Sequence, residues 1–179
     1  MRFVFSGPES CGKSTLAKLI HQKSGIPMVR EFSRQYLTDK GVIYDLQDVY
    51  QMGLLQRWEE LVTNGKYEHV ICDTDLLTIL IWQSVKYGHC DHHLLQLWKE
   101  CPPDIYFLCV PDIPWEYDVL RENPFDRMGI FDIYKRWLDE YKMNYFILEG
   151  TFESKIELVI KQVTSFTNVN FHSDHSNNF

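Results

Sequence analysis

The chain alternates short apolar runs with longer segments in which apolar residues recur every three or four positions. Short apolar runs are typical of buried strands, and the longer spacing is typical of amphipathic helices. The predicted strands cover residues 2–6, 27–31, 69–72, 105–110 and 145–148. The predicted helices cover residues 13–24, 32–38, 46–64, 76–87, 92–100, 131–143 and 153–166. This alternation predicts an α/β fold, a five-stranded parallel sheet flanked by helices on both faces.

The longest predicted helix begins after Asp45, which suits the N-cap position. Its apolar residues at helical spacing, expected to form the buried face, are Leu54, Leu55, Trp58, Leu61 and Val62. We expect residues 1–166 to form one domain. Residues 167–179 are polar and aperiodic, so a frayed tail is predicted there.

Composition and charge exclude several classes of protein. Hydrophobic residues make up 45% of the chain and charged residues 24%, as in soluble globular proteins. The net charge of -7 argues against a nucleic-acid partner, which calls for a clustered basic face. No apolar stretch is long enough to span a bilayer. Five irregularly spaced cysteines and an N-terminus that runs straight into a strand predict a reduced, cytoplasmic protein.

A glycine-rich loop joins the first predicted strand to the first predicted helix. It matches G-x-x-x-x-G-K-[ST] and consists of Gly7, Pro8, Glu9, Ser10, Cys11, Gly12, Lys13 and Ser14, followed by Thr15. Glycines let several backbone amides turn toward one phosphate, and the helix that follows adds the positive end of its dipole. Lys13 is expected to reach the β- and γ-phosphates of ATP, and the Ser14 hydroxyl to bind Mg²⁺. Strand, loop and helix in this order predict an ATP site.

Acidic residues follow the third predicted strand. Asp73 ends the strand, where P-loop enzymes hold the carboxylate that serves the magnesium ion. Asp75 would point the same way if the chain stayed extended, because side chains alternate along a strand. Its alternative role is the N-cap of the next helix.

Charged residues on two further segments are candidates for the acceptor side. Glu31 closes the second strand, where it could take the proton of an acceptor hydroxyl or simply favour the start of a helix. Arg30 and Arg34 flank it and could neutralise phosphate or pair with it. Arg121 and Arg127 could form a lid over the triphosphate, or belong to a solvated loop.

Taken in order, these motifs resemble the nicotinamide riboside kinase domain of NadR-type NAD-salvage proteins. The resemblance rests on the phosphate loop and on residues 29–34, 73–78, 81–82, 111–115 and 118–127, and it covers residues 1 to about 166. It implies transfer of the ATP γ-phosphate to the 5′-hydroxyl of nicotinamide riboside. The bifunctional members of the family carry an adenylyltransferase domain ahead of the kinase. This chain starts at its first strand, so we expect it to make the mononucleotide only.

The resemblance also implies roles for individual residues. Asp73 would be the acid beside the metal, Glu31 and Asp75 would hold the ribose or activate its hydroxyl, and Arg121 and Arg127 would be lid arginines. Arg34 would belong to the acceptor site, and a wall for a flat cationic base would come from Trp82, Tyr36 or Tyr87.

Two alternatives to this function stay open, a kinase for another nucleoside or small metabolite and a regulatory ATPase. Cys11 stands where the family leads us to expect Ser. Its thiol is either sensitive to oxidation or inert.

Overall fold

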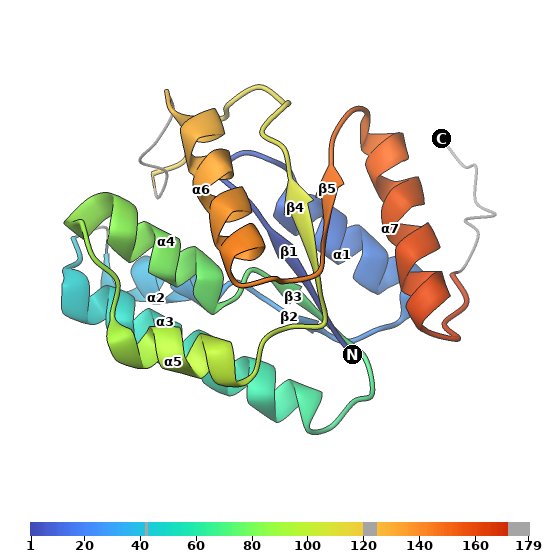
Figure 1. The fold of residues 1–179 in the computed structure, drawn as a ribbon, viewed down its shortest axis with the longest axis horizontal. Coiled ribbons are helices and arrows are strands. Elements are labelled where there is room, and N and C mark those ends of the chain that lie inside the picture. The colour runs from blue at the N-terminus through green and yellow to red at the C-terminus, as the bar shows by residue number, and fades with distance from the viewer. Residues whose placement is uncertain (42, 120–124, 172–179) are drawn as a thin grey trace.

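The computed structural model describes residues 1–41, 43–119 and 125–171 (Figure 1). Its strands are β1 (Arg2–Ser6), β2 (Met28–Val29), β3 (Val70–Asp73), β4 (Ile105–Cys109) and β5 (Tyr145–Leu148). Across these described ranges they form one five-stranded sheet in the order β2-β3-β1-β4-β5, and every neighbouring pair is parallel. The predicted five-stranded parallel sheet is confirmed.

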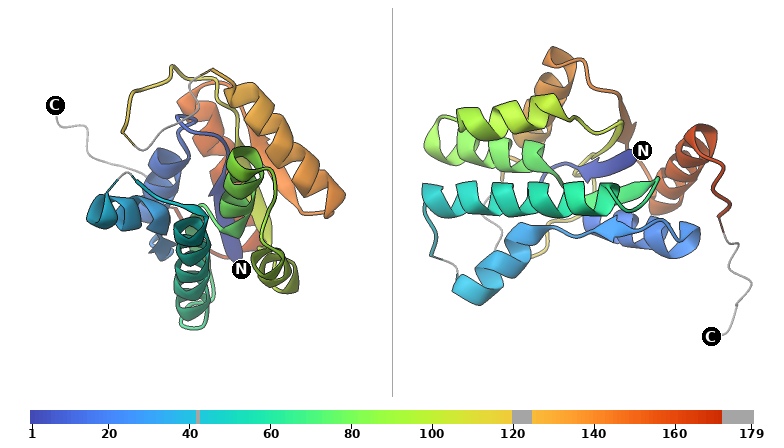
Figure 2. Two further views of the ribbon diagram at one scale, coloured as in Figure 1. Left: turned by 90° about the vertical axis from the view of Figure 1, so that its left-hand side faces the viewer. Right: turned by 90° about the horizontal axis from the view of Figure 1, so that it is seen from below.

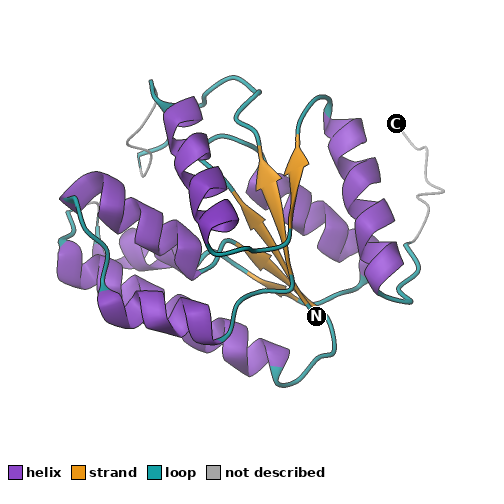
Figure 3. Cartoon of the chain, in the orientation of Figure 1, coloured by secondary structure: helices purple, strands orange, loops and turns teal. Residues whose placement is uncertain are grey.

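Helices cover both faces of this sheet (Figures 1 and 3). They are α1 (Lys13–Ser24), α2 (Phe32–Lys40), α3 (Leu46–Asn64), α4 (Leu76–Tyr87), α5 (His92–Glu100), α6 (Arg127–Glu140) and α7 (Phe152–Phe166). Helices α1 and α7 pack on one face, while α3, α4, α5 and α6 pack on the other (Figure 2). None of the described helices combines the length and apolar composition that crossing a bilayer requires.

The core is divided between the two faces because strand side chains alternate. On β4, Tyr106 and Leu108 join the cluster under α3 to α6. Phe107 and Cys109 join the cluster under α1 and α7. The Phe107 ring lies 5.1 Å from that of Phe5, between ring centroids, so aromatic contacts tie β1 to β4.

The buried face of α3 is not the apolar face that its spacing predicted. Trp58 is 58% exposed and Leu61 47% exposed. The residues buried instead are Val49, Met52, Gly53, Gln56, Arg57 and Glu60. Glu60 is buried because it pairs with two arginines, Arg2 at 3.3 Å and Arg57 at 3.1 Å. A buried arginine at the start of β1 needs a carboxylate, and this requirement overrides apolar periodicity.

Several segment boundaries also differ from the prediction. Helix α6 begins at Arg127 rather than at residue 131, because the Asp126 side chain accepts a hydrogen bond from the Gly129 amide and caps it. Strand β2 is limited to Met28–Val29 at the edge of the sheet. Within the predicted tail, Val169 and Phe171 are partly buried and pack against the core cluster under α1 and α7. The rest of the predicted tail, residues 172–179, lies outside the described residues.

Candidate active site

The phosphate loop follows β1 and is bent through left-handed backbone conformations. Gly7 has φ 139° and Gly12 has φ 84°. A Cβ on Gly7 would lie 2.7 Å from the Cys109 carbonyl oxygen, so both conformation and space require glycine there. Ser10, with φ 51°, also lies in this region, which is uncommon for a residue with a side chain. The loop is therefore held in a strained bend.

Helix α1 begins at the end of this bend without a side-chain cap. Its N-cap, Gly12, supplies no side-chain hydrogen bond, and its first turn holds no acid. Helices α3 to α7 are each capped by a side chain, from Asp45, Asp75, Asp91, Asp126 and Thr151. The absence of a side-chain cap and the helix dipole together make the start of α1 a candidate anion site.

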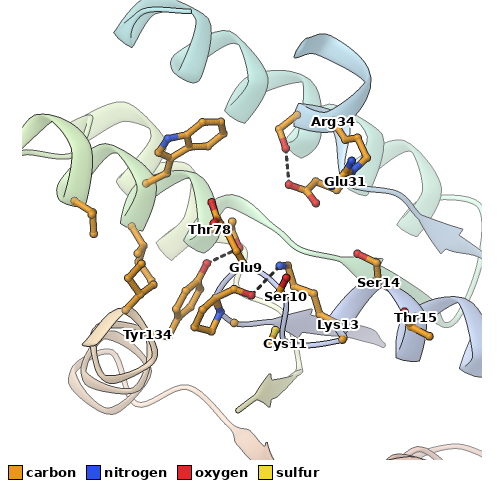
Figure 4. Close-up of a pocket in the computed structure, with 18 of the residues that line it drawn as sticks. Glu9, Ser10, Cys11, Lys13, Ser14, Thr15, Glu31, Arg34, Thr78 and Tyr134 are labelled. Atoms are coloured by element: carbon orange, nitrogen blue, oxygen red, sulfur yellow. Dashed lines mark hydrogen bonds between the residues drawn. The ribbon is translucent and has the colours of Figure 1, made fainter. Parts of the chain in front are cut away.

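Lys13 lies at the head of α1, and its ammonium group projects into the pocket. Its Nζ donates to the Pro8 carbonyl at 3.1 Å (Figure 4). Burial acts to lower the pKa of Lys13, but the charges of Cys11, Glu31 and Asp73 outweigh it and raise the pKa. The lysine is therefore a fixed positive charge beside the uncapped start of α1.

Asp73 ends β3 directly beside the phosphate loop, since it is in register with Phe5 of the neighbouring strand. It is 5% exposed, and its Oδ1 has no hydrogen-bond partner among the described residues. Burial raises the pKa of Asp73 to about 6, Glu31 adds to the shift, and Lys13 and a hydrogen bond with Ser14 oppose it. An orphaned carboxylate oxygen beside a hydroxyl fits the oxygen ligands that Mg²⁺ takes.

Asp75 does not face the pocket, which corrects the prediction that it binds substrate. The chain does not stay extended after Asp73, because Thr74 adopts φ 71° and turns it aside. The Asp75 carboxylate is 1% exposed, accepts from the Leu77 amide at 3.1 Å and also accepts from the Tyr106 hydroxyl. It serves as the N-cap of α4, the alternative role stated for it above.

A pocket of about 350 Å³ extends from the phosphate loop toward α2 and α4. Glu31, Ser33 and Arg34 line it from the start of α2. The Glu31 side chain does not cap α2; it lines the pocket and accepts from the Ser33 hydroxyl at 2.6 Å. Figure 4 shows Glu31 and Lys13 on different walls of this one cavity. The phosphate loop and a carboxylate thus share a pocket.

The opposite wall contains residues that were assigned no individual role from the sequence, although Thr78 and Ile81 lie in segments that carry the resemblance. Thr78 on α4 and Tyr134 on α6 line the pocket, and the Tyr134 hydroxyl donates to Thr78 Oγ1 at 3.2 Å (Figure 4). Leu37, Ile81, Val85, Lys86 and Ile130 line it as well. The apolar residues among them recur at the helical spacing of ordinary core residues, so their periodicity does not distinguish them.

Of the three aromatic residues expected beside a base, only Trp82 lines the pocket. Its indole Nε1 donates to the Tyr44 hydroxyl at 3.1 Å, and the two rings meet edge to face at 5.1 Å. Tyr36 is turned toward α3, where its hydroxyl donates to Asp48 at 2.8 Å. Tyr87 packs against the core. The predicted contacts of Tyr36 and Tyr87 with substrate are therefore not supported by their positions.

The arginines lie at the edge of the site. Arg127 does not line the pocket; its Nη1 donates to the carbonyls of Ser10 at 3.1 Å and Ile113 at 2.9 Å. It thus ties the segment after β4 to the phosphate loop. Arg34 lines the pocket and pairs with Asp118 at 2.9 Å, and Arg30 is exposed outside it. Arg121, the other predicted lid arginine, lies outside the described residues.

The fold and the loop define the class: this is an α/β protein with the P-loop kinase fold. Residues 2–155 match the family model described as an AAA domain. The chain belongs to the AAA domain family.

Solved structures with known ligands share the fold. The NadR protein in complex with NR aligns with a TM-score of 0.72 at 16% identity, over 98% of this chain and 54% of that protein. The chain thus spans about half the length of NadR. Deoxyadenosine kinase from M. mycoides, with products dCMP and dCDP bound, aligns with a TM-score of 0.61 at 16% identity, over 92% of this chain and 100% of that one.

Thymidylate kinase from Ehrlichia chaffeensis aligns with a TM-score of 0.64 at 18% identity, over 91% of this chain and 98% of that one. Identities this low show a common fold and no more. A search of curated proteins found no match to the chain.

Proposed function

We propose that the protein is a small-molecule kinase that transfers the γ-phosphate of ATP to the 5′-hydroxyl of nicotinamide riboside. The observation that carries this proposal is a single pocket that joins an uncapped helix start, Lys13 and the Glu31 carboxylate. The first two features suit a phosphate donor, and the carboxylate suits a hydroxyl acceptor. A protein that only binds nucleotide has no need of the acceptor carboxylate.

The donor half of the reaction is electrostatic. The loop amides and Lys13 would hold the phosphates and stabilise the charge that shifts onto the leaving group. Ser14 and Asp73 would bind Mg²⁺, which neutralises phosphate charge when it is bound. Arg127 supports this half indirectly, because it fixes the loop carbonyl at Ser10.

The acceptor half depends on Glu31 and Trp82. Glu31 would accept the proton of the attacking hydroxyl, with its carboxylate oriented by the Ser33 hydroxyl. Trp82 offers an indole face or edge to a flat ring, and a cationic pyridinium gains from contact with an aromatic face. The NadR complex with NR supports this choice of acceptor because it shares the fold.

The test is release of ADP from Mg·ATP in the presence of a panel of nucleosides. We expect turnover with nicotinamide riboside and formation of its mononucleotide. Lys13→Ala should abolish turnover and leave the fold intact, whereas Lys161→Ala, an exposed lysine of α7, should change neither. Turnover of a deoxynucleoside but not of nicotinamide riboside would contradict the proposed acceptor. ATP hydrolysis without any phosphorylated product would contradict the kinase activity itself.

A further inference from the structure

Two cysteines from distant parts of the chain meet beneath the phosphate loop. Cys11 lies within the loop and Cys109 is the last residue of β4. They are 1% and 0% exposed and belong to the same core cluster. A Cβ on Gly7 would lie 3.1 Å from Cys11 Sγ and 3.4 Å from the Cys109 nitrogen. The missing side chain of Gly7 therefore leaves room for the Cys11 thiol to pack against the end of β4.

The Cys11 thiol and the Cys109 backbone both lie against the Gly7 position, and the two side chains pack in one core cluster. Each thiol also shifts the pKa of the other. Cys11 also lines the pocket beside the phosphate loop, whereas Cys109 does not line it. Peroxide in that pocket therefore meets Cys11 first, and Cys109 supplies the second thiol that disulfide formation needs.

The surroundings of Cys11 favour its thiolate. Burial acts to raise the pKa of Cys11. The hydrogen bond with Cys109, the charge and amide of Lys13 and the charge of Lys155 outweigh burial and lower the pKa to about 6. A thiolate is the form that attacks peroxides, and the start of a helix stabilises it.

We propose that Cys11 and Cys109 form a reversible, peroxide-sensitive disulfide pair that controls the phosphate loop. In the first step the Cys11 thiolate attacks one oxygen of hydrogen peroxide, the O–O bond breaks, and the second oxygen leaves as water after it takes up a proton. In the second step the Cys109 sulfur attacks the Cys11 sulfenic sulfur. The S–S bond forms, the S–O bond breaks, and the hydroxyl leaves as water with the Cys109 proton. Peroxide is reduced and the two thiols are oxidised.

The bond must displace the loop. A disulfide holds its two sulfurs about 2.05 Å apart, well below the separation of two unbonded sulfur atoms in van der Waals contact. Closing this gap draws Cys11 toward β4, and the Gly7 position is already in close contact with the Cys109 backbone. The Cys11 amide belongs to the phosphate-binding bend, so the oxidised loop should lose affinity for a triphosphate.

The experiment treats the intact protein with hydrogen peroxide and maps its disulfides by mass spectrometry after alkylation of free thiols. We expect one pair of peptides joined through Cys11 and Cys109. Its mass should be lower by two hydrogen atoms than the sum of the two reduced peptides, and dithiothreitol should separate them. Cys109→Ser removes the acceptor thiol without touching the pocket, and it should give no linked pair. Cys90→Ser, on the other face of the sheet, should behave as wild type.

A second readout measures binding of a fluorescent ATP analogue. Oxidation should weaken binding of the analogue about tenfold or more in wild type, and dithiothreitol should restore it. Oxidation of Cys90 or Cys101 ahead of Cys11, or a Cys11 sulfinic acid with no linked pair in the folded protein, would overturn the proposal. The peptide map needs no nucleotide, so a protein that binds no ATP but forms this bond contradicts the proposed function and leaves the disulfide inference standing.

Discussion

Replacement of Asp75 tests whether this carboxylate is structural or catalytic. In Asp75→Ala, α4 loses its N-cap, which contributes about 1 kcal/mol. Tyr106 is 0% exposed, and its buried hydroxyl loses the acceptor for its hydrogen bond, at a cost of about 1–3 kcal/mol. The two effects together predict a loss of about 2–4 kcal/mol in the free energy of unfolding. For a chain of this size this corresponds to a fall in Tm of about 5–15 °C.

Asp75→Asn is the matched variant, because asparagine caps helices as well as aspartate and keeps an oxygen for Tyr106. We expect it to lie within about 1 kcal/mol of wild type. Thermal and urea unfolding give the stabilities, and ADP release at 20–25 °C gives turnover, which should change by no more than a few-fold in either variant, because Asp75 does not line the pocket.

The result that refutes the N-cap role is a loss of turnover without a loss of stability. A general base contributes about 10²–10⁴-fold to the rate. A fall of this size in Asp75→Asn, at unchanged Tm, would place Asp75 in the chemistry.

Three other substitutions test the site and the packing. Asp73→Asn should raise the Tm of the nucleotide-free protein at pH 7.5 by removing a buried charge worth about 2–3 kcal/mol, and it should abolish magnesium-dependent turnover. The folded-state pKa of Asp73 is raised to about 6, so its destabilising effect is least below pH 4 and grows as the pH rises through 6. The stability difference between variant and wild type should therefore increase over this range. A pH series that shows no difference between them contradicts this. Glu31→Gln should lower turnover by about 10²-fold or more, with ATP affinity unchanged, as measured by steady-state kinetics and analogue binding; unchanged turnover would make Glu31 an ordinary helix-start residue. Gly53→Ala should lower stability by about 1–3 kcal/mol in urea unfolding, since the new Cβ would lie 2.9 Å from Leu94 and 3.2 Å from Ile79; a stabilised variant would show that α3 can move away from its neighbours.

Features that depend on neighbouring residues were determined by the sequence alone. The strands and most helices were predicted because apolar periodicity and capping residues act over a few positions. The phosphate loop was predicted because its glycines, lysine and serine carry their backbone and charge requirements within one short segment. Asp73 was placed at the loop because the strand that it ends is short, apolar and parallel to its neighbours.

Features that depend on distant residues were decided only by the tertiary structure. The left-handed turn at Thr74 sent Asp75 into the core, against the extended geometry assumed for it. The ion pair of Arg2 with Glu60 determined which face of α3 is buried, against the apolar spacing of the helix. The hydrogen bond of Thr78 with Tyr134, and the packing of Cys11 and Cys109 in one cluster beside Gly7, join segments far apart in sequence. Each of these contacts depends on strand order and helix docking, and these follow from burial summed over the whole chain rather than from any local pattern.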